Sequence, residues 1–140
     1  MKTILIADDE ESLRTLIVTT LEAPGLRILQ AADGNEAVEL ARQEHPDLVL
    51  LDWRMPGKTG IEVAEVLRGN AATADIAILM LTAMGQEQDR QRGLALGIRA
   101  YLVKPFSPLQ LLECVRRTLA NQDAKTDQAR SRVHEKMQRG

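Results

Sequence analysis

Polar side chains that could do chemistry directly follow four of the aliphatic runs in this sequence. They are Asp8-Asp9-Glu10, Asp52, Thr82 and Lys104. Each has an ordinary explanation when taken singly, because an aspartate after a strand often caps a helix and a lone lysine is usually solvated. If the runs are parallel strands of one sheet, however, their carboxyl ends share an edge and these groups converge there.

Carboxylates gathered at one edge repel each other unless a cation joins them or a proton neutralises one. Loosely arranged oxygen ligands favour Mg²⁺ over Zn²⁺. The sequence offers no rival soft-metal site, because Cys114 is the single cysteine and His45 and His134 are far apart. A carboxylate in such a group can attack phosphorus to form an acyl phosphate. Mg²⁺, a lysine and a hydroxyl or backbone amide would then stabilise the phosphoryl oxygens.

Five short aliphatic runs supply the strands that would position these groups. They are Thr3–Ala7, Leu26–Leu29, Leu48–Leu51, Ile76–Leu81 and Ala100–Val103. Several are apolar at nearly every position, which is typical of parallel strands covered on both faces. Stretches of helical spacing separate them, and this alternation implies right-handed crossovers in an open, doubly wound α/β sheet. The sequence predicts a (βα)5 sandwich over residues 1–120.

Helical stripes of apolar residues define the intervening helices. The first three stripes are Leu13, Leu16, Ile17 and Leu21; Ala37, Leu40 and Ala41; and Ile61, Ala64 and Leu67. A weaker helix is expected over residues 86–96. In the last helix, Leu109, Leu112, Val115 and Leu119 are expected to face the sheet, with Leu111, Cys114 and Thr118 as a short, mixed outer patch. The polar, mildly basic residues 121–140 either extend this helix or are disordered.

Length and composition exclude several classes of protein. The chain has 140 residues and a net charge of −2, which suits one domain and gives no general electrostatic attraction to nucleic acid. No apolar run approaches the roughly 18 residues that a membrane span needs, and the N-terminus does not resemble a secretory signal. The single cysteine excludes an internal disulfide framework and suits a reducing, cytoplasmic location.

Four sequence blocks together resemble the receiver domain of two-component response regulators, with an extent similar to that of single-domain chemotaxis regulators. The blocks are residues 4–10, ending in Asp8-Asp9-Glu10; 47–57, from Asp47 to Gly57 with Gly60 beyond; 81–83; and 97–106, ending in Lys104-Pro105-Phe106. The resemblance implies a flavodoxin-like fold with a five-stranded parallel sheet in the order 2-1-3-4-5. It covers residues 3–120.

The resemblance also implies a role for each matching residue. Asp52 is expected to be the phosphoacceptor. Asp8, Asp9, Asp52 and the backbone carbonyl of Arg54 are expected to hold Mg²⁺.

The expected switch residues lie on the last two strands. Lys104 is expected to pair with the phosphate and to be followed by a cis peptide bond to Pro105. Thr82 is expected to move toward the phosphoryl group beside the small residue Ala83, and Tyr101 to turn inward behind it. A covalent phosphate would bias this two-state switch.

Two neighbours of the site are expected to tune how long the phosphoryl group survives. Arg54 and Met84 would border the path of a hydrolytic water. Neither side chain is an obvious general base, so we predict slow self-dephosphorylation.

The sequence therefore favours a phosphorylation-controlled interaction module rather than a turnover enzyme. Its expected partners are a sensor histidine kinase or histidine phosphotransfer protein, and a downstream protein that binds the surface of the fourth helix, fifth strand and fifth helix. Phosphorylation-dependent homodimerisation is a further possibility. Other readings are a phosphate-shuttling receiver in a phosphorelay and the receiver part of a larger DNA-binding regulator. DNA binding by these 140 residues alone is not expected.

Two readings from other classes fit less well. A phosphohydrolase with an aspartate nucleophile usually has an acid/base carboxylate two residues later, where this chain has Arg54. A nucleotide-binding protein of similar fold needs glycines and backbone donors in the first loop, which here is acidic.

Overall fold

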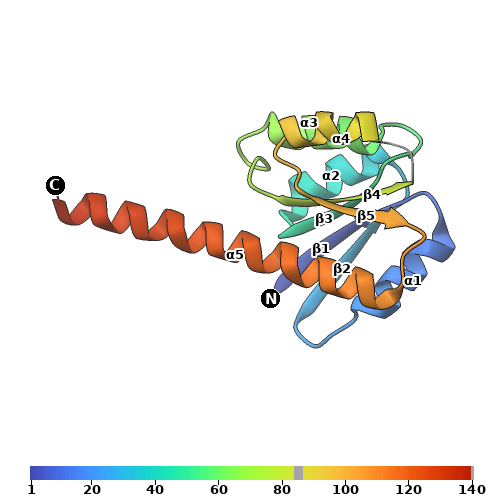
Figure 1. Cartoon of the computed structure of the whole chain (residues 1–140), viewed down its shortest axis with the longest axis horizontal. Coiled ribbons are helices and arrows are strands. Elements are labelled where there is room, and N and C mark those ends of the chain that lie inside the picture. Colours follow the sequence, from blue (N-terminus) through green and yellow to red (C-terminus); the bar gives the residue numbers. More distant parts are fainter. Residues whose placement is uncertain (84–86, 140) are drawn as a thin grey trace.

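A five-stranded parallel sheet forms the centre of the molecule, in the order β2-β1-β3-β4-β5 (Figure 1). The computed structural model describes the backbone of residues 1–83 and 87–139, and the side chains of residues 1–83 and 90–124. The strands are β1 (Lys2–Ala7), β2 (Leu26–Ala31), β3 (Leu48–Asp52), β4 (Ala77–Ala83) and β5 (Ala100–Lys104). The predicted fold class and strand order are confirmed.

Five helices cover the two faces of the sheet. They are α1 (Glu11–Leu21), α2 (Gly34–Glu44), α3 (Gly60–Arg68), α4 (Glu87–Ala95) and α5 (Pro108–Arg139). Helices α2, α3 and α4 lie over one face, and α1 and α5 lie over the other (Figure 1). This arrangement explains the apolar strands, because a central strand must pack against helices on both sides.

Alternation along each central strand divides the core into two layers. In β1, Leu5 and Ala7 pack into the layer under α2 and α3, whereas Ile4 and Ile6 pack into the layer under α1 and α5. Both layers are mainly aliphatic, as the shortage of aromatic residues requires. Each face therefore holds its helices by ordinary burial of apolar surface, worth about 25 cal/mol per Å².

Side-chain caps start two of the helices that flank the acidic edge. The Asp33 side chain accepts a hydrogen bond from the Glu36 N–H at the start of α2. At the start of α3, Thr59 and Glu62 form a reciprocal capping box. Such caps satisfy backbone N–H groups that have no partner within the helix.

Helix α5 docks with most of the face that its apolar spacing predicts, because Leu112, Val115 and Leu119 pack in the core layer under α1 and α5, but two of its leucines differ from the prediction. Leu109, expected to face the sheet, is 63% exposed, whereas Leu111, expected on the outer patch, is fully buried. The helix begins at Pro108, so Leu109 lies in its first turn. Val115, one turn after Leu111, is also buried, and this pair forms the centre of the contact with the sheet. The proposed outer patch therefore loses its largest apolar member.

Helix α5 continues well past the sheet, and Figure 1 shows its C-terminal end standing away from the body of the domain. Near the middle of the helix, Asp123 pairs with Lys2 of β1 at 2.5 Å. The Gln122 side-chain amide donates a hydrogen bond to the Asp75 backbone carbonyl. Although α5 is long, neither it nor any other helix in the described residues is apolar enough to cross a membrane.

Candidate functional site

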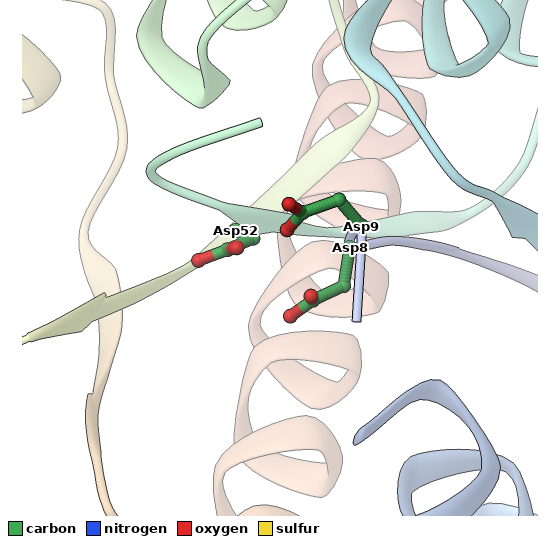
Figure 2. Close-up of side chains that lie close together, drawn as sticks. All are labelled: Asp8, Asp9 and Asp52. Carbon is green, nitrogen blue, oxygen red and sulfur yellow. The ribbon is translucent and has the colours of Figure 1, made fainter. Parts of the chain in front are cut away.

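Three carboxylates meet where β1 and β3 end, as Figure 2 shows. Asp8, Asp9 and Asp52 each offer an oxygen, and these oxygens all lie within 4.8 Å of one another. Asp8 is fully buried and Asp52 is buried, whereas Asp9 is exposed. Strands β1 and β3 are direct neighbours in parallel register, so the sheet itself brings these groups together.

Lys104 brings a positive charge to this cluster from the end of β5. Its Nζ donates to Asp52 Oδ1 at 2.9 Å and to Asp8 Oδ2 at 3.3 Å. The Lys104–Pro105 peptide bond is cis. The Asp52 side chain is 10% exposed, so it keeps a small area that solvent or a small donor can reach.

The combined effect of burial and nearby charges raises the pKa values of both Asp52 and Lys104. Burial raises the pKa of the Asp52 carboxyl, and nearby Asp8 adds to that rise although the Lys104 hydrogen bond opposes it. For Lys104, burial alone would lower the pKa, but the hydrogen bond to Asp52 and the charges of both aspartates raise it overall. Both directions follow from an excess of carboxylates over cations in a partly desolvated place.

The donor set fits a hard divalent cation. Three carboxylates face one ammonium group within the described site, and such an excess of negative charge is costly where water is partly excluded. Oxygen ligands without thiols or imidazoles suit Mg²⁺. The Arg54 backbone follows Asp52 in the same loop and could add a carbonyl oxygen.

Arg14 is a neighbour of the site that the sequence reasoning missed. Its Nη1 donates to the Asp8 backbone carbonyl at 2.6 Å, and its Nε donates to the Gln30 side chain at 3.3 Å. The Asp8 carboxylate also accepts a hydrogen bond from the Glu10 N–H at 2.9 Å. These contacts hold the first acidic loop in place. The available signal was an arginine one turn into a helix that follows an acidic run.

Glycines allow the loop after Asp52 to fold closely against its neighbours. A Cβ at Gly60 would lie 2.4 Å from the Asp52 backbone carbonyl oxygen, and one at Gly34 would lie 2.1 Å from the Lys58 carbonyl oxygen. Gly57 has a φ of +81°, in the left-handed region that favours glycine. Trp53 is buried in the core layer under α2 and α3.

The remaining predicted residues occupy the ends of β4 and β5. In the sheet register, Asp52 pairs with Leu81, Thr82 pairs with Val103, and Ala83 pairs with Lys104, so Thr82 and Ala83 lie at the same edge as the carboxylates. The Arg54 side chain is exposed. Met84 lies outside the described residues.

Tyr101 points toward α4 and rests against that helix. Its hydroxyl donates to the Arg90 backbone carbonyl at 3.2 Å, and the Arg90 guanidinium lies 4.9 Å from the centre of its ring. The other side of this contact is Gly93, where an added Cβ would lie 2.0 Å from the Tyr101 hydroxyl oxygen. Burial raises the pKa of this phenol, although the charge of Arg90 opposes the rise.

The geometry agrees with a comparison against known protein families. Residues 4–116 match the model of the response regulator receiver domain. The chain belongs to this family. Membership supports a signalling role for the receiver domain rather than turnover of a substrate.

Curated relatives of this receiver domain include transcriptional regulators. The phosphate regulon transcriptional regulatory protein PhoB of Pseudomonas aeruginosa is 45% identical over 111 residues, which are 79% of this chain and 48% of that protein. The probable transcriptional regulator ycf27 of Cyanophora paradoxa is 42% identical over 139 residues, covering 99% of this chain and 57% of that protein. The chain thus spans about half the length of the curated relatives it matches.

Solved receiver structures superpose well on this fold. The chemotaxis response regulator CheY4 of Vibrio cholerae matches with a TM-score of 0.78 and 36% identity, over 84% of this chain and 98% of that one. A CheY-like receiver domain protein from Methanospirillum hungatei matches with a TM-score of 0.82 and 27% identity, over 89% of this chain and 98% of that one.

Proposed function

We propose that this receiver domain accepts a phosphoryl group on Asp52 from a phosphohistidine of a sensor kinase or phosphotransfer protein. The observation that carries the proposal is the contact of Lys104 with Asp52 at 2.9 Å inside a cluster of three carboxylates. This arrangement places a nucleophile beside a fixed positive charge and a group of hard oxygen ligands. Few other reactions need all three at once.

Asp8, Asp9, Asp52 and the Arg54 backbone carbonyl would hold Mg²⁺ in this proposal. The bound ion supplies charge neutralisation for the phosphoryl oxygens, because three equatorial oxygens carry the charge in the transition state. Asp8 stays oriented through its bond from the Glu10 N–H, and Arg14 fixes the backbone that carries it.

The transfer itself exchanges one bond to phosphorus for another. A carboxylate oxygen of Asp52 attacks phosphorus, a P–O bond forms, and the P–N bond to the donor imidazole breaks. The imidazole leaves with the electron pair of that bond and takes up a proton. The Lys104 ammonium then donates its hydrogen bond to a phosphoryl oxygen in place of Asp52.

The switch residues connect the phosphate to the surface formed by α4, β5 and α5. Thr82 and Ala83 are adjacent in sequence on β4, and Tyr101 follows on the neighbouring strand. Each of these three elements carries one exposed large apolar side chain, namely Leu94 on α4, Val103 on β5 and Leu109 on α5. We propose that phosphorylation changes this surface and thereby controls a partner protein or a second copy of the chain.

The names and lengths of the curated relatives favour one particular output. These relatives are transcriptional regulators, and this chain matches about half the length of each. We therefore propose control of transcription as the main alternative to a stand-alone signalling module. The receiver would act either as part of a longer DNA-binding regulator or by binding such a regulator. The phosphoryl group would be lost slowly, because the exposed Arg54 offers no general base beside Asp52 and Met84 is expected to offer none either.

Intact mass after incubation with acetyl phosphate tests the proposal directly. The wild type is expected to gain one phosphoryl group, only when Mg²⁺ is present, and Asp52→Asn is expected to gain none. Asp33→Asn is a matched control, since it also converts a carboxylate to an amide near this edge of the sheet and asparagine preserves the helix cap. An adduct that persists in Asp52→Asn, or that forms equally in the presence of a chelator, would refute the assignment.

A further inference from the structure

The loop between β3 and α3 is closed at its base beside the carboxylate cluster. The Trp53 N–H donates to a carbonyl of β4 at 2.9 Å, and the Gly60 N–H donates to the Trp53 carbonyl at 2.9 Å. Trp53 and Met55 are each 8% exposed and pack in the core layer under α2 and α3. Arg54, whose carbonyl is a proposed metal ligand, lies between these two buried residues in the chain.

The second half of the same loop rests on the start of α2. The Gly34 N–H, which has no partner within the helix, donates to the Pro56 carbonyl at 3.1 Å. A Cβ at Gly34 would lie 2.1 Å from the Lys58 carbonyl oxygen, and one at Gly57 would lie 2.8 Å from the Asn35 side-chain nitrogen. Backbone therefore contacts backbone at this junction.

We propose that Gly34 is a positioning residue for Mg²⁺ binding, because it holds the loop that carries the Arg54 carbonyl. The inference rests on the metal site proposed above, which consists of Asp8, Asp9, Asp52 and that carbonyl. Mg²⁺ requires nearly ideal octahedral geometry, so a displaced ligand is costly. Residues that support metal ligands from behind change the metal affinity by about 10–100-fold when they are replaced.

A side chain at position 34 would move the loop rather than the helix. The Lys58 carbonyl oxygen would have to move from 2.1 Å to about 3.4 Å, where ordinary contact begins, a shift of about 1.3 Å. The start of α2 is held by the Asp33 cap, and Ala37 and Val38 are buried in the core. On the loop side, by contrast, Pro56 is exposed and Lys58 is half-buried.

Urea unfolding of the full chain at increasing Mg²⁺ concentrations tests the proposal. An ion that binds the folded state raises the free energy of unfolding by an amount set by its concentration and its Kd, so Kd and metal-free stability are measured separately. We expect Gly34→Ala to weaken the Kd for Mg²⁺ at least about tenfold. The Kd for Ca²⁺ should weaken by a smaller factor, because Ca²⁺ accepts irregular coordination.

Gly69→Ala is the matched control, since the nearest atom to its new Cβ is 3.3 Å away and belongs to α3. It is expected to change the Kd for Mg²⁺ by less than about twofold. A role of Gly34 in helix packing alone would lower the metal-free stability and leave the Kd for Mg²⁺ unchanged.

A second pair of variants tests the junction from the side of the loop and decides the matter if Gly34→Ala does not fold. Gly57 and Gly25 have φ values of +81° and +79°, so alanine imposes the same backbone strain at both. A Cβ at Gly25 meets nothing within 4 Å. We expect the Kd for Mg²⁺ to be at least about tenfold weaker in Gly57→Ala than in Gly25→Ala.

The outcomes separate this inference from the proposed function. An unchanged Kd for Mg²⁺ in Gly34→Ala, or an equal weakening for Mg²⁺ and Ca²⁺, would overturn the inference and leave the proposed function in place. Equal Kd values in Gly57→Ala and Gly25→Ala would overturn it too. If Mg²⁺ does not stabilise the wild type, or stabilises Asp9→Ala equally, the proposed metal site fails and the inference fails with it.

Discussion

Replacing Gly93 with alanine is expected to move Tyr101 while leaving the acidic site untouched. The new Cβ would lie 2.0 Å from the Tyr101 hydroxyl oxygen, whereas ordinary contact begins near 3.4 Å. The hydroxyl must therefore retreat by about 1.4 Å, the difference between these two distances. The hydroxyl is the far end of a side chain, so the ring is expected to move rather than the backbone.

The free energy of unfolding is expected to change little, because the terms oppose each other. The displaced hydroxyl loses its hydrogen bond to the Arg90 carbonyl, worth about 1 kcal/mol. The contact between Arg90 and the ring is worth about 0.5–1 kcal/mol at an exposed site. Against these losses, alanine favours a helix interior over glycine by about 1 kcal/mol. The expected net change is a destabilisation of about 1 kcal/mol or less.

The pKa of Tyr101 is the measurement that reports the movement. Burial is the main reason that this pKa is raised, so a ring released toward solvent should titrate at lower pH, nearer the ordinary value for tyrosine. The chain has one tyrosine, so the ultraviolet absorbance of the phenolate reports this group alone. Because the pKa of Tyr101 is higher in the folded state, its protonated phenol stabilises the wild-type fold at neutral pH. This contribution to the free energy of unfolding is lost as the pH rises through the titration of the phenol.

Gly69→Ala is the control, since it makes the same substitution at the end of α3, where the nearest atom to the new Cβ is the Glu65 carbonyl oxygen. It should leave the Tyr101 titration unchanged. The reasoning would be refuted if Gly93→Ala kept the wild-type phenol titration, or if it lowered stability by more than about 3 kcal/mol, the upper range for an overpacked core.

Three further expectations concern other parts of the chain. Arg68→Met should lower the free energy of unfolding in urea by about 2–4 kcal/mol, because three hydrogen bonds from a charged donor are lost while the apolar part of the side chain remains. The control Arg42→Met, at an exposed position, should change this free energy by less than about 0.5 kcal/mol. Equal effects of the two substitutions would contradict this account. Burial raises the pKa of the Cys114 thiol, so its alkylation by iodoacetamide should have a higher midpoint pH in the folded protein than in urea, and a lower midpoint would disprove it. Gly60→Ala should lower the free energy of unfolding by about 1–3 kcal/mol and slow phosphorylation by acetyl phosphate, because the new Cβ would lie 2.4 Å from the Asp52 carbonyl oxygen. An unchanged phosphorylation rate would contradict this prediction and show that the loop adapts without cost.

The alternation of strands and helices and the place of the acidic site can be predicted from the sequence alone. Short runs that are apolar at nearly every position and alternate with stretches of helical spacing are typical of parallel strands covered on both faces, and parallel strands align their carboxyl ends. Asp8, Asp52 and Lys104 therefore had to meet at one edge once the strands were assigned. The separation between these residues in the chain did not matter, because a sheet converts it into neighbouring strand ends.

The tertiary structure alone decided which side of α5 is buried and what the helices present to one another. Leu109, Leu111 and Leu112 lie so close in sequence that apolar spacing supports more than one rotation of the helix, and docking against the sheet selects Leu111. The contact of Tyr101 with α4 and the hydrogen bond from Arg68 to the Leu96 carbonyl likewise combine separate segments of the chain. Such contacts depend on how whole elements pack, and no periodicity within a single element encodes them.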